Sequence, residues 1–290
     1  MTVQIFLFCF IVTSVTMPPL PPPVVIHNLV EKKLPLVEHD KPKVVAHRAD
    51  PKPTPSLHPE KSREINAKPC KRHRPDSCSQ NICKQYSINL KMNKAYFNFR
   101  YNKCFCSQCY PITKADYFTV AGSIYTVPRH WTRFGLQIDQ TFAESKQIFK
   151  QWYTTFYGTS KDKLESIINN RFVPMPGDHL LSNEIFTTHL SDKHHVYTSP
   201  SIKYACLKHV CPIDILNIHS EWYDVQIVLE CKQNPEGIVK QHGYRQNVCN
   251  IIPDNEIEWK TDRRASIIPY GLLIHVQKHR CTKECINIHS

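Results

Sequence analysis

The distribution of proline is the feature that most constrains how this chain can fold. Most of its 22 prolines fall before Pro75, in a stretch with almost no aromatic residues. A segment so poor in large apolar side chains cannot offset the entropy lost on ordering. We therefore predict a disordered, polyproline-like linker over residues 17–76. The rest of the chain is long enough to form a hydrophobic core.

An apolar run from Ile5 to Val15 precedes these prolines. Its length suits the hydrophobic region of a signal peptide and is too short for a membrane span. No Lys or Arg precedes the run, and Met17 is an alternative start. Residues 1–16 are therefore either a signal peptide of a secreted protein or part of an intracellular chain. No membrane span is predicted.

Charge narrows the class of partner only slightly. The formal net charge is +12, with 37 Lys and Arg, and part of the excess lies between Lys68 and Arg74. A basic balance suits nucleic acid, a membrane surface or an acidic substrate, and also an ordinary basic protein. Because no stacking aromatics or RNA-binding motif are interleaved with the basic run, a nucleic-acid partner has only weak support.

Short strands and helices are predicted from about Cys78 onward. Asp139 is expected to cap a helix that carries Phe142 and Phe149, and Thr159–Asp162 is expected to be a capping box. Apolar alternation or β-branched and aromatic runs predict strands at the following positions: Tyr96–Tyr101, Trp152–Gly158, Val196–Ser199, Val225–Cys231 (half-buried), Ile257–Trp259 and Tyr270–Val276 (central).

Many strands with a few short helices indicate an α+β fold. One predicted helix follows the capping box and presents Leu164, Ile167 and Ile168 on one face, and a shorter helix runs from Pro200 to Tyr204. The expected domain order is a Cys-rich subdomain over residues 77–136, a second domain over 137–278 and a tail over 279–290.

Three of the 13 cysteines, Cys104, Cys106 and Cys109, form a tight knuckle. Such spacing places three thiolates around one metal ion, and zinc prefers four ligands in a closed tetrahedron. We assign Cys83 as the fourth ligand, with Cys78 and His73 as alternatives. In a secreted protein the same residues would instead form disulfides.

Three separated segments carry the strongest signal for a ligand site. Phe156–Ser160 ends a strand and enters a helix, and the glycine within it lets a ligand approach the backbone closely. The second segment is Val196–Ala205 and the third is Asn255–Thr261. His194-His195, just before the second segment, is interpreted as a surface pair, with a weak metal site as the lesser alternative.

These segments resemble the catalytic core of the poly(ADP-ribose) polymerase class of ADP-ribosyltransferases. The resemblance also rests on the knuckle, on Trp131…Arg133-Phe134-Gly135-Leu136 and on Tyr270-Gly271-Leu272-Leu273. The resemblance is strongest to a PARP-like domain found in some neuralized-like proteins and in many invertebrate and fungal proteins. It covers Cys104 to Ile274. It implies split antiparallel sheets around an NAD cleft, and transfer of single ADP-ribose units to a protein acceptor. The related domains are mostly intracellular, which favours zinc over disulfides.

The resemblance also implies roles for individual residues. In that class, a tyrosine stacks on the nicotinamide ring and a glutamate stabilises the positive charge that develops on the ribose. Tyr197 matches the tyrosine, and Glu258 or Glu256 matches the glutamate. Because the two glutamates are two positions apart on a predicted strand, they are expected to face the same side. Glu258 is preferred, since it precedes Trp259.

The cofactor-binding positions implied by the resemblance are Gly158, which would hold the carboxamide, together with Thr159, Ser199 and Tyr204. The position before Gly158 departs from the family pattern, because Tyr157 stands where a histidine is expected. Its longer side chain would reach into the space of the ribose. The chain is therefore either a transferase or a degenerate fold that binds a protein or nucleotide without turnover. A third alternative is a secreted effector held together by disulfides.

Overall fold

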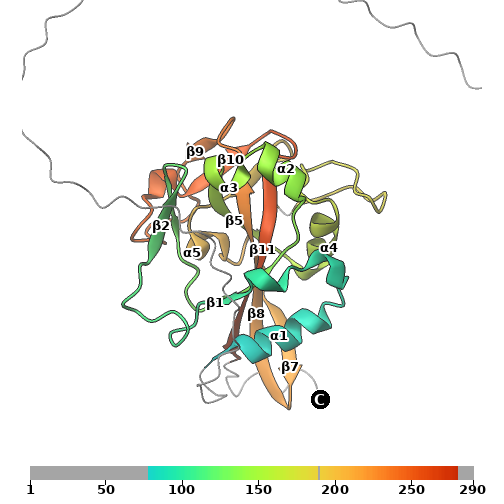
Figure 1. Ribbon diagram of the computed structural model, residues 1–290, viewed down its shortest axis with the longest axis vertical. Coiled ribbons are helices and arrows are strands. Elements are labelled where there is room, and N and C mark those ends of the chain that lie inside the picture. Colours follow the sequence, from blue (N-terminus) through green and yellow to red (C-terminus); the bar gives the residue numbers. More distant parts are fainter. Residues whose placement is uncertain (1–77, 189, 280–290) are drawn as a thin grey trace, which may run out of the picture. The chain divides into compact units, whose positions relative to one another are not determined.

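Two long antiparallel strands, β8 (Glu221–Gln233) and β11 (Ile267–Lys278), form the centre of the computed structural model, which describes residues 78–188 and 190–279 (Figure 1). They pair along most of their lengths, with an irregularity between Pro269 and Gly271. β11 has a neighbour on either side. The prediction of a central strand at Tyr270–Val276 is thus confirmed.

Shorter strands flank this pair. The order in the main sheet is β1 (Lys103–Cys104), β4 (Thr132–Gly135), β11, β8 and β5 (Tyr153–Thr159), and β7 (Asp214–Ile218) pairs with the first part of β8. All of these pairings are antiparallel. The strand predicted at 225–231 is present but is not half-buried, because apolar side chains cover both of its faces.

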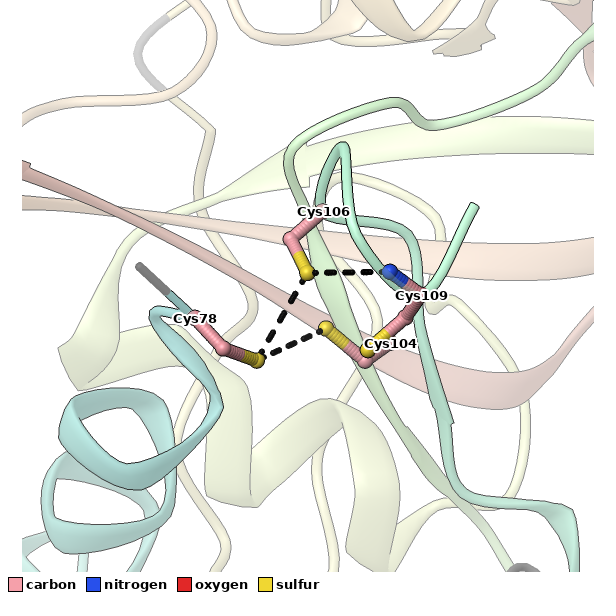
Figure 2. Close-up of side chains that lie close together, drawn as sticks. All are labelled: Cys78, Cys104, Cys106 and Cys109. Carbon is pink, nitrogen blue, oxygen red and sulfur yellow. Dashed lines mark hydrogen bonds between the residues drawn. The ribbon is translucent and has the colours of Figure 1, made fainter. Parts of the chain in front are cut away.

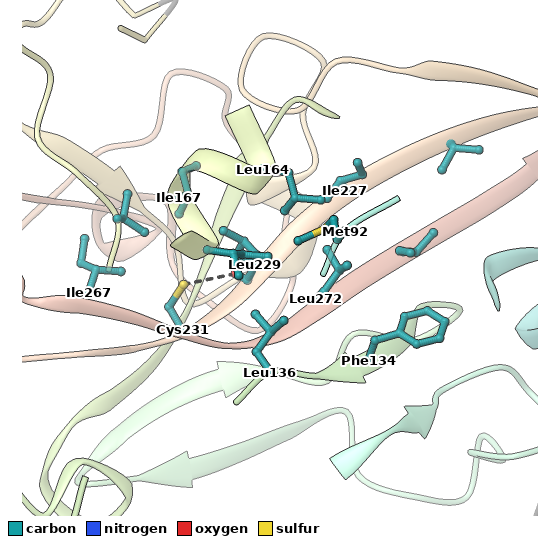
Figure 3. Close-up of a cluster of buried hydrophobic side chains, with 14 of the residues drawn as sticks. Met92, Phe134, Leu136, Leu164, Ile167, Ile227, Leu229, Cys231, Ile267 and Leu272 are labelled. Carbon is teal, nitrogen blue, oxygen red and sulfur yellow. Dashed lines mark hydrogen bonds between the residues drawn. The ribbon is translucent and has the colours of Figure 1, made fainter. Parts of the chain in front are cut away.

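One face of the main sheet packs against helices α1 (Gln80–Asn89) and α4 (Lys161–Asn169). Leu164 and Ile167 of α4 are fully buried in a cluster with Ile227 of β8 (Figure 3). The predicted apolar face of this helix is confirmed. On the opposite face of the sheet lies a second cluster, which contains Phe105, Trp131, Phe156, Val228 and Leu273.

Two smaller sheets complete the fold. One is three-stranded, in the order β6 (Val196–Thr198), β10 (Glu258–Thr261), β9 (Val239–Gln241), and the other is the hairpin of β2 (Tyr117–Val120) and β3 (Ser123–Thr126). Phe156 and Ser199 exchange two backbone hydrogen bonds of 2.7 and 3.0 Å. This bridge joins β5 of the main sheet to the end of β6, and short helix α5 (Ile202–Ala205) follows directly.

The aromatic segment Tyr96–Tyr101 is not the predicted strand. It forms parts of two 3₁₀ turns, η2 (Lys94–Tyr96) and η3 (Phe99–Tyr101). Asn93 and Asn98 cause this outcome, because each side chain accepts a backbone N–H at the start of a turn. Aromatic content alone favours a strand, and the two asparagines override it.

The helices near residue 140 and residue 160 differ from their predictions at their ends. Asp139 caps α2 (Gln140–Ser145) by accepting from the N–H of Phe142 at 2.9 Å, as expected. The helix stops before Phe149, because Gln147 adopts a left-handed conformation and α3 (Ile148–Gln151) begins anew. At α4, Ser160 is the N-cap residue, but its side chain makes no capping hydrogen bond, so the predicted capping box is not formed.

The described residues belong to one compact unit of mixed α+β class, with antiparallel sheets and few helices. The expected boundary at residue 136 does not divide this unit, because β1 and β4 lie in the same sheet as β5, β8 and β11. The predictions for residues 1–16, 17–76 and the end of the tail lie outside the described residues. In the described part, no helix is long and apolar enough to cross a membrane.

Candidate functional site

An open pocket lies where the main sheet meets the three-stranded sheet. Its walls come from β5, α4, β6, α5 and β10, with Phe186 and Leu190 from the segment between α4 and β6. Seven of the residues assigned by the resemblance line this pocket: Tyr157, Gly158, Thr159, Tyr197, Ser199, Tyr204 and Glu258. The fold therefore brings together residues from sequence segments about a hundred positions apart.

Glu258 is the carboxylate of this pocket. Its Oε2 accepts a hydrogen bond from the Tyr204 hydroxyl at 2.6 Å, and its Oε1 accepts one from Gln241 Nε2 at 2.6 Å. Two donors from different elements thus fix the orientation of the carboxylate. Each carboxylate oxygen keeps a further lone pair with which it can contact a ligand.

Glu256 does not share the position of Glu258. It ends the 3₁₀ turn η4 (Asp254–Glu256), and β10 begins only at Glu258. The expected alternation along one strand therefore does not apply, and the two carboxylates are not equivalent. Glu256 is half-exposed and forms an ion pair with Lys240 at 3.1 Å. Glu258 is thus the one of the two that lines the pocket.

Tyr204, in the pocket wall, supports Glu258. Its side chain is 3% exposed, and its oxygen also accepts a hydrogen bond from the N–H of Tyr244 at 2.8 Å. Burial, followed by the hydrogen bond to Glu258, raises the pKa of Tyr204 above its ordinary value. The phenol stays protonated at neutral pH and remains a donor to the carboxylate.

Tyr197 is held by a residue that the sequence did not single out. Its hydroxyl donates to Asp192 Oδ2 at 2.6 Å, and His195 Nδ1 lies 2.8 Å from the same oxygen. The hydrogen bond from Tyr197, with a smaller effect of the same sign from His195, holds the pKa of Asp192 well below its usual range. His195 itself lines the pocket, whereas His194 is exposed. The interpretation as a surface pair thus fails for His195.

Gly158 has an intramolecular reason to be glycine. A Cβ at this position would lie 2.3 Å from the carbonyl oxygen of Ala205 and 3.2 Å from Cβ of Cys211. The missing side chain lets β5 approach α5 and the segment after it. The sequence suggested that the glycine admits a ligand, and the structure shows that it admits the chain's own backbone.

Tyr157, at the departure from the family pattern, lines the pocket and packs against the hydrophobic cluster under α4. Burial raises the pKa of its hydroxyl above the ordinary value. Ser199 is 1% exposed, and its hydroxyl donates to the carbonyl of Ile257 at 2.6 Å and accepts from the N–H of Ser201 at 3.0 Å. Its side chain therefore supports the pocket wall from within.

A cluster of cysteine side chains lies at and next to β1. The Sγ atoms of four cysteines lie within 4.8 Å of one another, as Figure 2 shows for Cys78, Cys104, Cys106 and Cys109. The sulfur of Cys78 is 3.6 Å from those of both Cys104 and Cys106. This arrangement is close enough to bind one metal ion. In the described part of the chain, Cys78, Cys104 and Cys106 form no disulfide.

The fourth cysteine of this cluster is Cys78, so our choice of Cys83 as the fourth ligand is wrong. Cys83 lies on α1, is fully buried against the core, and its Sγ is 3.6 Å from the carbonyl oxygen of Ile274. Burial raises the pKa of this thiol to about 12. The alternative Cys78 precedes α1 and reaches the knuckle. His73 lies outside the described residues.

Buried and partly buried polar side chains lie together on neighbouring strands of the main sheet. Arg133 of β4 pairs with Glu230 of β8 at 3.1 Å, and Tyr270 of β11 donates to the same carboxylate at 2.7 Å. On β8, Lys232 is 4% exposed and donates to Thr154 of β5 at 2.9 Å. Sequence reasoning missed Glu230 and Lys232, because charges within a strand ordinarily indicate a solvated face.

The chain matches none of the protein-family models, none of the curated proteins and none of the solved structures with which it was compared.

Proposed function

We propose that this domain binds NAD in the pocket and transfers single ADP-ribose units to a protein acceptor. The observation that supports the proposal is the convergence on one pocket of seven residues assigned by the resemblance, from β5, β6, α5 and β10. The resemblance implies an NAD cleft formed by these residues, and a shared pocket is what such a cleft requires.

The chemistry of the pocket wall suits such a ligand. The rings of Tyr157, Phe186 and Tyr197 offer apolar surfaces to a planar base. Glu258 offers a fixed carboxylate, which would stabilise positive charge developing on a ribose during cleavage of the glycosidic bond. Lys163 lines the same pocket and offers a cation to a phosphate.

Labelling with radioactive NAD tests the proposal. The wild-type protein should label itself or an added protein mixture. Glu258→Gln should lower labelling by about a hundredfold or more, because an uncharged amide stabilises the transition state far less. Glu256→Gln is the matched control and should label normally, since its carboxylate pairs with Lys240 outside the pocket. Absence of labelling in the wild type contradicts the transferase activity.

A second function, binding without turnover, is favoured by one observation. Tyr157 stands in the pocket where an imidazole is expected, and its ring packs against the core. Under this hypothesis, Tyr157→His increases the affinity for NAD without restoring labelling. Isothermal titration calorimetry with NAD measures the affinities of the wild type and of Tyr157→His. An absence of heat in both proteins contradicts NAD binding altogether.

We further propose that the four-cysteine cluster holds a structural zinc ion. Four sulfurs arranged tetrahedrally at about 2.3 Å from zinc lie about 3.8 Å from one another. The observed separations of 3.6 Å from Cys78 to two partners are close to this value. Cys78 is equally near both, whereas a disulfide would select one. Four thiolates leave no open position for substrate, so the role is structural.

Metal analysis of the purified protein tests the zinc site. Mass spectrometry of metal content should find one zinc per chain, and Cys78→Ser should abolish it. Cys83→Ala is the informative control and should keep the metal, since this thiol lies in the core. A metal-free protein whose cysteines resist alkylation without reductant would support the secreted, disulfide-stapled alternative instead.

A further inference from the structure

An imidazole and a carboxylate form a pair at the edge of the pocket. His195 immediately precedes β6 and lines the pocket, and its Nδ1 is 2.8 Å from Asp192 Oδ2. The two side chains are 31% and 26% exposed. Both side chains are therefore partly exposed, and of the two it is His195 that lines the pocket.

Asp192 is itself fixed at both of its oxygens. Oδ1 accepts the backbone N–H of His194 at 2.7 Å, and Oδ2 accepts the Tyr197 hydroxyl at 2.6 Å. A carboxylate held in this way accepts the Nδ1 proton of the neighbouring imidazole. The lone pair of a neutral His195 then lies on Nε2. The same logic orients imidazoles in metal sites and in catalytic triads.

Nε2 of His195 is an acceptor that the chain itself leaves open. Across residues 78–188 and 190–279, no hydrogen bond to Nε2 is found. Most other polar side chains of the wall already donate to acceptors within the chain: Thr198 to Gln233, Ser199 to the carbonyl of Ile257, Tyr197 to Asp192, Tyr204 to Glu258 and Lys163 to Thr187.

We propose that Asp192 holds His195 as its Nδ1–H tautomer, so that Nε2 accepts a hydrogen bond from a hydroxyl of the bound ligand. Asp192 is a positioning residue, and His195 contacts the ligand. Two acceptors, Nε2 of His195 and the carboxylate of Glu258, suit a ligand with several hydroxyls. Aromatic walls suit a base attached to it. The ligand class is a ribose-containing nucleotide, and its identity as NAD rests on the proposed function.

The tautomer is tested without any ligand. In a protein labelled with ¹⁵N-histidine, the two-bond nitrogen–proton spectrum distinguishes Nδ1–H from Nε2–H, and His195→Gln assigns the signals by their loss. We expect the Nδ1–H pattern in the wild type and its replacement by a mixture in Asp192→Asn. His194→Gln is the matched neighbour and should leave the pattern unchanged. An Nε2–H pattern in the wild type overturns the inference.

Ligand contact is tested by calorimetry with NAD and ADP-ribose. His195→Ala should weaken binding about tenfold, the usual effect of losing one hydrogen bond. His195→Gln should restore part of it, because the amide oxygen is also an acceptor. His194→Ala should bind as the wild type does. Unchanged affinity in His195→Ala overturns the inference and leaves NAD binding intact. Absence of binding to the wild type overturns the proposed function, and the tautomer then decides the inference alone.

Discussion

The cysteine cluster and the pocket are built in opposite ways. At the cluster, four identical ligands converge on one point, and their chemistry calls for an ion from outside the chain. In the pocket, the key polar groups are bonded to one another, as Glu258 is to Tyr204 and Gln241, and Tyr197 is to Asp192. The cluster should therefore need its ligand in order to be stable, whereas the pocket is preformed without one.

Loss of the proposed zinc ion should produce the largest effect in the molecule. Because a structural zinc contributes its binding energy to folding, Cys106→Ser should lower the free energy of unfolding by about 5 kcal/mol or more. Amide hydrogen exchange should become faster in β1 and β4, because Cys104 of the cluster lies in β1 and β1 pairs with β4. A chelator added to the wild type should act in the same way.

Cys206→Ser provides the control for this prediction. Cys206 is only partly buried, lies outside the cluster, and its Sγ contacts the carbonyl of Lys203, which a serine hydroxyl can also do. A chelator that removes zinc should lower the stability of Cys206→Ser by no more than it lowers that of the wild type. If Cys106→Ser were as stable as Cys206→Ser, the contrast between cluster and pocket would be lost.

Substitution in the buried ion pair of the main sheet should have the next largest effect on stability. Glu230 is 2% exposed and pairs with Arg133 while accepting from Tyr270. Glu230→Gln removes one charge of a buried pair and leaves the other uncompensated, which costs about 4 kcal/mol. Chemical denaturation measures it. Glu236→Gln, at an exposed pair with Arg263, should leave stability unchanged.

Much of this fold could be predicted from local patterns. The apolar run at 270–276 and the face of Leu164 and Ile167 are periodic signals, and burial confirms both. Tyr197, Gly158 and Glu258 could be placed together only because their motifs resembled an ordered set. Composition alone gives no reason for residues from β5, β6 and β10 to share a pocket.

The errors share a physical cause, which is that tertiary contacts decide between local alternatives. Cys78 and Cys83 both lie at suitable sequence distances from the knuckle, but only Cys78 precedes α1 and escapes the core. Glu256 was assigned to a strand, and a 3₁₀ turn ends on it instead. The buried positions of Glu230 and Lys232 depend on strand neighbours that no local pattern specifies.

Lys232 provides a pH-dependent test of the buried charged side chains of β8. Burial is the main cause that lowers its pKa from 10.5 to about 8, and Glu230 opposes this effect. Between these values the unfolded chain binds a proton that the folded chain has lost, so the contribution of Lys232 to stability rises with pH. At about 1.4 kcal/mol per pH unit, the free energy of unfolding gains about 3 kcal/mol as pH rises from 8 to 10.5. The same gain is lost as pH falls back to 8.

The measurement compares the wild type with Lys232→Met between pH 7 and pH 10.5. Other groups titrate in this range in both proteins, and they cancel in the difference. The difference in unfolding free energy should move by about 3 kcal/mol in favour of the wild type as pH rises. A difference that is constant with pH would mean that the ammonium is stabilised where it lies, by Thr154 and by the rings of Phe149 and Tyr270.

The smallest of these effects tests whether the pocket is preformed. Tyr204→Phe removes the hydroxyl that donates to Glu258 and accepts from Tyr244, without changing the buried ring. The loss of a hydrogen bond to a charged group should lower the free energy of unfolding by about 2 kcal/mol. Tyr244→Phe, at an 84% exposed ring, should have no such cost. NAD affinity should fall in Tyr204→Phe, because Glu258 keeps only Gln241 to orient it. If NAD restored the lost stability in full, the ligand rather than the protein would orient the carboxylate, and the pocket would depend on its ligand as the cysteine cluster depends on its metal.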